Sequence, residues 1–149
     1  MCQDFEELLA SFNAAGVRYL VGGAHALALH ARPRATKDLE LFVDPTKANA
    51  ARVLKALRSF FGGAVPSYVS VEALLDADTI LQLGVAPVRV DILSSLATTT
   101  FRRAYNRRAQ AMFGSVPADY LSRDDLVAET RHFDRPQDRA DVEALLRGP

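Results

Sequence analysis

The sequence has little of what marks several common classes of protein. It has one cysteine, Cys2, in 149 residues, which excludes an internal disulfide framework and a cysteine-rich zinc site. Its net charge is zero, so no overall field attracts it to nucleic acid or to a membrane surface. No apolar run approaches the length of a membrane span, and the acidic first residues lack the apolar core of a signal peptide. A cytoplasmic protein with no membrane partner is expected.

What the sequence does have is enough apolar material for one core. Hydrophobic residues make up 49% of the chain, so 149 residues can bury a core without disulfides or a structural metal. Helical and strand patterns alternate from end to end, and no flexible linker, repeat or low-complexity tract separates them. We therefore expect a single domain over residues 1–149.

The order of the predicted elements indicates an α/β (α+β) fold. Apolar spacing, capping residues, glycines and prolines predict helices at 4–15, 24–30, 44–60, 70–75 and 98–112, one that begins at Ser122, and one at 136–146. Apolar runs rich in β-branched residues predict strands at 18–21, 38–43, 79–83, 88–93 and 115–121, with the third and fourth as a hairpin. We expect a mixed sheet of about four to five strands, flanked by helices, with a C-terminal helical part at about 122–147.

Three carboxylates lie on two of the predicted strands. Asp38 and Glu40 are two residues apart, so their side chains point to the same face of the strand. Asp91 lies between apolar residues in a second strand. Adjacent carboxylates repel one another unless a proton or cation lies between them, and a hard divalent metal is a natural ligand for them. The alternative is a plain surface ion pair, in which Asp38 binds Arg34, Lys37 or Arg89.

A glycine pair, Gly22-Gly23, ends the first apolar strand and begins a predicted helix. Two interpretations remain open. The pair can simply allow a tight strand-to-helix turn. It can also let phosphate groups approach the backbone N–H groups at the helix N-terminus, where the helix dipole favours anions. The carboxylates downstream favour the phosphate-binding interpretation.

This pattern of Gly22-Gly23, then Asp38-x-Glu40, then a lone Asp91 in an apolar strand resembles the nucleotidyltransferase superfamily with the polymerase-beta-like fold. The similarity is greatest to small bacterial members of the antitoxin-associated and lincosamide-modifying type. It continues near the C-terminus in Asp125-Leu126-Val127 and in the stretch 134–142. The motifs together cover most of the chain, from about residue 18 to about residue 146.

The resemblance implies a reaction and a set of roles. It implies that Asp38 and Glu40 bridge two Mg²⁺ or Mn²⁺ ions, while Asp91 completes the metal site and accepts the proton of the attacking hydroxyl. It implies ATP or another nucleotide triphosphate as substrate. It also implies that an arginine and a threonine of the basic loop before Asp38 bind the phosphates of this nucleotide, and a neighbouring lysine is a further candidate. Those loop residues are Arg34, Thr36 and Lys37.

One position departs from the family pattern. Relatives carry a lysine, directed at the triphosphate, where this sequence has Thr130. Threonine cannot neutralise phosphate charge, and the neighbouring Arg131 is the nearest substitute in the sequence. The departure favours a second hypothesis, a catalytically impaired protein of this fold that binds a nucleotide or a partner, for example within a toxin–antitoxin pair.

A third hypothesis is a nucleic-acid-binding module. The stretch 101–108 is the one dense basic patch, and in a helix Arg103 and Arg107 would share a face, with Tyr105 available for stacking. A solvated surface helix is the alternative. The histidines have no zinc-motif spacing.

We rank nucleoside monophosphate transfer to a hydroxyl of an unknown acceptor (RNA, protein or small molecule) first. We also expect a homodimer, because the chain is short for a complete cleft.

Overall fold

Six strands form one mixed sheet in the computed structural model, which describes residues 3–34, 36, 38–85 and 88–149. The strands are β1 (Tyr19–Val21), β2 (Asp38–Val43), β3 (Ile80–Val85), β4 (Val88–Leu93), β5 (Ala109–Phe113) and β6 (Val116–Tyr120). The helices are α1 (Gln3–Ala14), α2 (Gly23–His30), α3 (Lys47–Phe60), α4 (Val71–Leu75), α5 (Phe101–Asn106), α6 (Arg123–Phe133) and α7 (Pro136–Arg147). The mixed sheet with helices around it confirms the predicted fold class.

The sheet order is β3-β4-β2-β1-β6-β5, which places β2 in the interior of the sheet. Strand β2 runs antiparallel to β1 and parallel to β4. The hairpin of β3 and β4 forms one edge of the sheet, and the hairpin of β5 and β6 forms the other. The two strands that carry the predicted acids are therefore direct neighbours, although more than forty residues separate them in the sequence.

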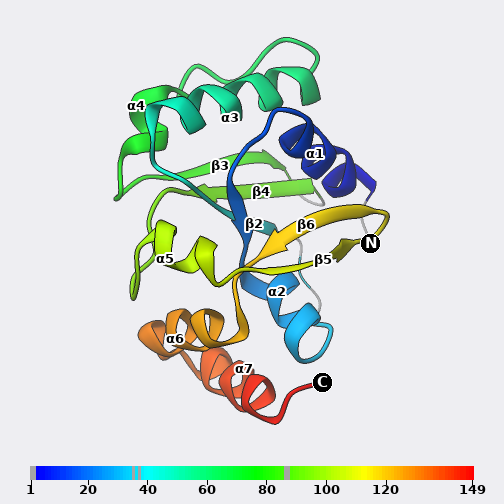
Figure 1. Cartoon of the computed structure of the whole chain (residues 1–149), viewed down its shortest axis with the longest axis vertical. Helices are drawn as coiled ribbons and strands as arrows, with labels where there is room; N and C mark the ends of the chain where they lie inside the picture. The colour runs from blue at the N-terminus through cyan, green and yellow to red at the C-terminus, as the bar shows by residue number, and fades with distance from the viewer. Residues whose placement is uncertain (1–2, 35, 37, 86–87) are drawn as a thin grey trace.

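The helices form a layer on each side of the sheet. Helices α1 and α3 lie together on one side, and α2, α6 and α7 lie on the other (Figure 1). Because side chains alternate along a strand, β2 divides its residues between the two sides. Leu39 and Leu41 are fully buried in the core, while Asp38 and Glu40 point to the side of α2. The sheet thus presents its acids to the layer that α2, α6 and α7 form.

Side-chain caps fix where several helices begin. The hydroxyl groups of Thr46, Ser70, Thr100 and Ser122 each accept a hydrogen bond from the backbone N–H three residues later. Such a cap satisfies one of the free N–H groups in the first turn and stabilises the helix by about 1 kcal/mol. The last two helices, α6 and α7, lie within the predicted helical part at 122–147. Among the described residues, no helix combines the length and the apolar character that crossing a bilayer requires.

The predicted helix at 98–112 is wrong in its second half. Helix α5 ends at Asn106, and Ala109–Phe113 is a strand that pairs with β6. Gly114 has a φ of 60°, a conformation that glycine adopts without strain, and it turns the chain back so that Phe113 faces Val116. The hairpin accounts for a sheet of six strands, where the sequence indicates about four to five.

Candidate active site

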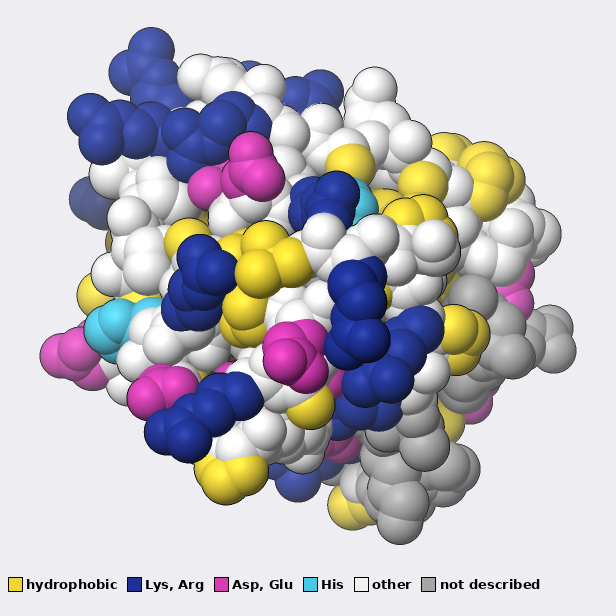
Figure 2. Space-filling view, turned by 90° about the horizontal axis from the view of Figure 1, so that it is seen from below, with side chains coloured by type: hydrophobic (Ala, Val, Ile, Leu, Met, Phe, Trp, Pro, Cys, Tyr) yellow, Lys and Arg dark blue, Asp and Glu magenta, His cyan; other side chains and the backbone are white. Residues whose placement is uncertain are grey.

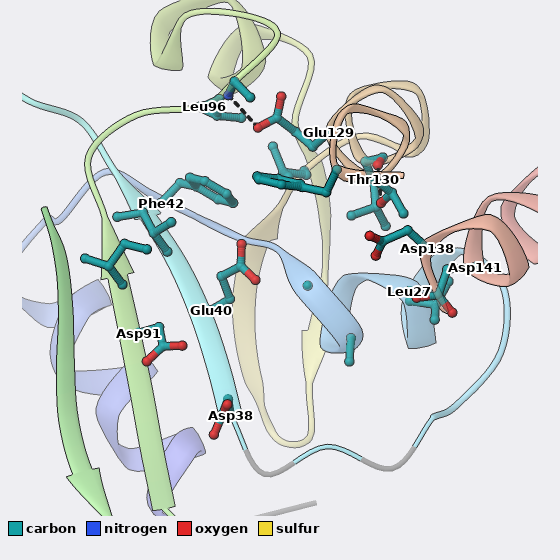
Figure 3. Close-up of a pocket in the computed structure, with 18 of the residues that line it drawn as sticks. Leu27, Asp38, Glu40, Phe42, Asp91, Leu96, Glu129, Thr130, Asp138 and Asp141 are labelled. Carbon is teal, nitrogen blue, oxygen red and sulfur yellow. Dashed lines mark hydrogen bonds between the residues drawn. The ribbon is translucent and has the colours of Figure 1, made fainter. Parts of the chain in front are cut away.

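Four charged residues form a square on the face of the sheet that looks toward α2. In the parallel pairing of β2 and β4, Asp38 lies opposite Arg89, and Glu40 lies opposite Asp91. Strand alternation places all four side chains on the same face. The three carboxylates line a cavity of about 460 Å³, and Figure 3 shows them along the two strands, with α6 and α7 across from them. The structure therefore brings the three predicted acids together on one wall of one cavity.

Glu40 is the least compensated of these acids. Burial, and then the negative charges of Asp91 and Glu129, raise the pKa of Glu40 to about 7, while the positive charge of Arg135 acts in the opposite direction. Both causes disfavour the ionised carboxylate, because the group has lost water and lies beside like charge. A cation at this position would relieve both.

Arg89 supplies some positive charge at the other two corners. Its Nε donates to Oδ1 of Asp91 at 3.4 Å and lies 3.8 Å from Oδ1 of Asp38. The Arg89 and Asp38 side chains are 37% and 41% exposed, whereas that of Asp91 is 20% exposed. Of the ion pairs that the sequence allows for Asp38, the one with Arg89 is present.

The donor set fits a divalent cation in its chemistry. Three carboxylates on one wall supply the oxygen ligands that Mg²⁺ and Mn²⁺ prefer, and the pKa of Glu40 is raised first by burial and then by the neighbouring negative charges. Within the described part of the chain, however, no three acidic, histidine or cysteine side chains converge closely enough to form a metal-binding group. Asp38, Glu40 and Asp91 would therefore have to move closer together around an ion.

The glycine pair lies directly beside the acids. Gly22 precedes α2 without a side-chain cap, and its N–H donates to the backbone carbonyl of Glu40 at 2.9 Å. Gly23 has a φ of 58°, and a Cβ at this position would lie 2.7 Å from Oε2 of Glu40. The positive φ favours glycine at this position, which agrees with the turn interpretation and leaves the phosphate-binding interpretation open. Gly23 and Ala24 also line the cavity, so the first turn of α2 borders the same space as the acids.

The basic loop before β2 contributes two described residues to the cavity wall, Arg34 and Thr36. Nη2 of Arg34 lies 3.5 Å from Oδ2 of the buried Asp141 on α7, so this guanidinium joins the loop to the C-terminal helix. The hydroxyl of Thr36 is bonded to the backbone of Asp38, where it accepts from the N–H at 3.2 Å. Lys37 lies outside the described residues.

The C-terminal helices do place a cation at the cavity wall, but it is Arg135, which sequence reasoning did not select. Thr130 lines the cavity, but its hydroxyl donates to the carbonyl of Leu126 within its own helix at 2.6 Å. Arg131 is exposed and lines a separate small groove instead. Arg135, at the start of α7, lines the cavity and lowers the pKa of Glu40 by its charge. Its position directly before Pro136, a residue that favours the first turn of a helix, was the signal in the sequence.

Two known structures share this arrangement of helices and strands. A crystal structure of ANT(2'')-Ia in complex with adenylyl-2''-tobramycin aligns with a TM-score of 0.57 and 12% identity, over 96% of this chain and 86% of that one. A solution structure of the antibiotic-resistance factor ANT(2'')-Ia aligns with a TM-score of 0.54 and 14% identity, over 97% of this chain and 80% of that one. The chain has a nucleotidyltransferase fold.

Comparison of sequences adds nothing more specific to this fold. No family model matches the chain, and no curated protein matches it. Because their identity to this chain is low, the two ANT(2'')-Ia structures show a similar fold and nothing narrower. The narrower prediction, an antitoxin-associated or lincosamide-modifying type, is not supported by them and stays a prediction.

The cavity wall contains a further buried acid, Glu129, that sequence reasoning did not select. Glu129 on α6 is 7% exposed and accepts hydrogen bonds from the backbone N–H groups of Ala97 and Thr98 at 2.7 and 2.8 Å. The hydroxyl of Thr98 donates to the same carboxylate. Leu96 and Ala97 line the cavity, so Glu129 holds this part of the wall in place. No local motif marks such a residue, because its partners are 31 and 32 residues away in the sequence.

The basic stretch after residue 100 has mainly structural contacts in this fold. The guanidinium of Arg107 binds the buried Asp125 through two hydrogen bonds, of 2.8 and 3.1 Å. Arg108 lies over the ring of Tyr105, 4.0 Å from its centroid, and Phe101 stacks on the same ring. The ring is therefore occupied by its neighbours, which argues against base stacking. Figure 2 shows acidic and hydrophobic side chains among many of the basic ones on the face seen from below.

The histidines also have structural surroundings. His25 lies between the rings of Phe5 and Phe113, with centroids 5.6 and 5.1 Å away, and burial lowers its pKa. Nε2 of His30 forms a hydrogen bond of 2.7 Å with the carbonyl of Leu121. Neither ring is among the residues that line the cavity.

Proposed function

We propose that this protein transfers a nucleoside monophosphate from a nucleotide triphosphate, such as ATP, to a hydroxyl group of an acceptor, with release of pyrophosphate. One observation supports this proposal most strongly. Asp38, Glu40 and Asp91 lie on one wall of a cavity of about 460 Å³, and the first turn of α2, with Gly23, borders the same space. A site for this reaction needs acids to hold divalent metal and N–H groups or cations to hold phosphate.

In the reaction, the acceptor oxygen forms a bond to the α-phosphorus, and the bond from that phosphorus to the pyrophosphate oxygen breaks. Asp38, Glu40 and Asp91 would hold one or two Mg²⁺ or Mn²⁺ ions, which polarise the phosphate and acidify the attacking hydroxyl when bound. The carboxylate of Asp91 accepts the hydroxyl proton. Gly22 and Gly23 keep side chains away from the phosphates at the start of α2.

Positive charge for the triphosphate comes from two sides of the cavity. Arg34 lies at the loop side, beside the neutral hydroxyl of Thr36, and Lys37 belongs to the same loop in the sequence. Arg135 lies at the start of α7, and we assign to it the role that a lysine at position 130 would have. A guanidinium binds phosphate oxygens in a two-pronged geometry, which suits this role.

The acceptor is proposed only by class: an RNA, a protein or a small molecule with an exposed hydroxyl. The crystal structure of ANT(2'')-Ia contains an adenylylated small molecule, adenylyl-2''-tobramycin, which supports a small-molecule acceptor for that protein. We propose a homodimer in which two chains complete the acceptor side. Light scattering tests this directly, because the chain mass of 16.3 kDa would double.

Thermal stability with each nucleotide triphosphate, with and without Mg²⁺ or Mn²⁺, tests the proposal without knowledge of the acceptor. A ligand that binds only the folded state at about a hundred times its Kd adds roughly 2.7 kcal/mol of stability, which shifts the melting temperature visibly. We expect a metal-dependent shift in the wild type that is lost in Asp38→Ala. No shift with any nucleotide would remove the nucleotide site and with it the proposed reaction.

A catalytically impaired, nucleotide-binding protein, for example in a toxin–antitoxin pair, is the second candidate. The observation that favours it is that the C-terminal helices offer no free cation at two positions of the cavity wall: Thr130 is neutral and bonded within its helix, and Nε of Arg135 is bound to Asp138 at 2.6 Å. If the nucleotide shift is present but no pyrophosphate is released with any class of acceptor, this candidate replaces the enzyme.

A further inference from the structure

Arg89 is the basic member of the charged square that it forms with Asp38, Glu40 and Asp91. It lies opposite Asp38 in the strand register and two residues before Asp91 on β4. Its Nε is 3.4 Å from Oδ1 of Asp91 and 3.8 Å from Oδ1 of Asp38. A single nitrogen thus lies between two of the three carboxylates that the proposed function assigns to metal.

The third acid, Glu40, is diagonal to Arg89 in the square and opposite Asp91. Among the described residues, no three acids converge as a metal-binding group. Within the described part of the chain, the guanidinium of Arg89 thus supplies positive charge to Asp38 and Asp91. Carboxylates that already share a positive charge gain less from an added ion than free carboxylates do.

We propose that Arg89 is an internal counter-cation of the metal site. In the metal-free protein it neutralises Asp38 and Asp91, and it withdraws from both when a divalent cation binds. Arg89 therefore lowers the affinity of the site for divalent cations, and the ion binds by exchange with a side chain and not into an empty set of ligands. This inference rests on the proposed function, because it takes the three acids as the metal ligands.

The geometry allows this exchange. Both ion pairs are long, and ion pairs between partly exposed groups are weak. The Arg89 side chain is 37% exposed, so its flexible stem can carry the guanidinium toward water without crossing the core. A divalent ion brings twice the charge and can take oxygen ligands from all three acids at once, which Arg89 does not do. The ion therefore displaces Arg89 at a modest loss of affinity.

A different role would have the opposite effect. If Arg89 only orients Asp91 as a ligand, its removal would let that carboxylate turn away and would weaken metal binding. The sign of the change in metal affinity therefore separates a competing cation from an orienting one, and it does so without any measurement of catalysis.

Titration with MnCl₂ tests the inference in the full-length protein without nucleotide, with free Mn²⁺ measured by electron paramagnetic resonance. We expect Arg89→Gln to lower the Kd for Mn²⁺ by about tenfold, since two weak ion pairs no longer compete. Arg89→Lys keeps the charge and should bind Mn²⁺ like the wild type. Arg102→Gln, the same change at an exposed residue of α5, should have no effect. Circular dichroism confirms that each variant is folded.

Each outcome bears on a separate claim. Unchanged or weaker Mn²⁺ binding by Arg89→Gln, beside clear binding by the wild type, overturns the counter-cation role and leaves the proposed function standing. Tighter binding by Arg89→Lys as well as by Arg89→Gln would also overturn it, because the charge would then be irrelevant. Absence of Mn²⁺ binding in the wild type and in all folded variants overturns both this inference and the assignment of the three acids to metal.

Discussion

The ionisation of Glu40 changes the stability of the fold, and this change can be measured. Burial and Asp91 raise its pKa from the ordinary 4.5 to about 7. Between these values the folded protein binds more protons than the unfolded chain, so its stability falls as the pH rises. Glu40→Gln cannot lose a proton. We expect the variant to be more stable than the wild type at pH 8 by on the order of 3 kcal/mol, with the gain absent at pH 4. Urea denaturation at both pH values measures it.

The matched control is Glu143→Gln on α7. The Glu143 side chain is 75% exposed, and its ion pair with Arg147 lies in solvent. We expect its free energy of unfolding to stay within about 0.5 kcal/mol of the wild type at both pH values. Equal stability of Glu40→Gln and the wild type at pH 8 would mean that Glu40 is ionised in the fold without penalty, and that a cation compensates it.

Asp91→Asn should change the activity of the site and the stability of the fold in different ways. The change removes a proposed metal ligand and proton acceptor, and it also removes a negative charge that faces Glu40. We expect metal-dependent pyrophosphate release to fall by at least about a thousandfold, while the melting temperature is equal to or above that of the wild type. The measurements are a pyrophosphate assay over the classes of acceptor and a thermal melt. Undiminished release would place the third acid elsewhere.

Part of this site is predictable from single residues, and part is not. Strand alternation alone places Asp38 and Glu40 on one face. The pairing of Glu40 with Asp91 depends on a parallel register across a long intervening segment, which no local pattern specifies. The same register decides that Asp38 pairs with Arg89, one of several cations that the sequence allows.

At the scale of elements, boundaries marked by caps and turns are predicted well, and one element is not. Strand β2 has the predicted bounds, and Ser122 begins α6 as expected. Strand β5 was missed because Ala109-Gln110-Ala111-Met112 consists of residues common in helices, so propensity extended α5 through it. Tertiary pairing with β6 overrides that propensity, and the turn at Gly114 was the local sign of it.

Glu129 connects two elements, and its removal tests what that connection contributes. Its buried carboxylate accepts from the N–H groups of Ala97 and Thr98. Glu129→Ala leaves these donors without a protein partner, so we expect a loss of roughly 2–3 kcal/mol in the free energy of unfolding. Glu129→Gln keeps one acceptor oxygen and should lose less. Urea denaturation compares the two variants with Glu143→Ala as an exposed control. A loss below about 0.5 kcal/mol in Glu129→Ala would show that water replaces the carboxylate.

For the whole molecule, the C-terminal part of the chain is joined to the rest in several independent places. Arg34 binds Asp141 on α7, Arg107 binds Asp125 on α6, and the N–H of Leu121 donates to the carbonyl of Val21 at 3.0 Å. The sequence predicts one domain because no linker interrupts it, but it does not specify these contacts, since each joins residues far apart in the chain. Their number makes separate unfolding of α6 and α7 unfavourable.

We therefore predict that the metal-free protein unfolds in one cooperative transition. Scanning calorimetry should give a calorimetric enthalpy equal to the van't Hoff enthalpy, at roughly 100 kcal/mol near 60 °C for a chain of this size. Arg107→Gln leaves the buried Asp125 without its partner and should lower the melting temperature, but the transition should stay single because the other contacts remain. Two resolved transitions in the wild type would show that α6 and α7 form a separate unit. The cavity would then lie between two units that move relative to each other, and the wall formed by Thr130 and Arg135 would no longer have a fixed position relative to Glu40.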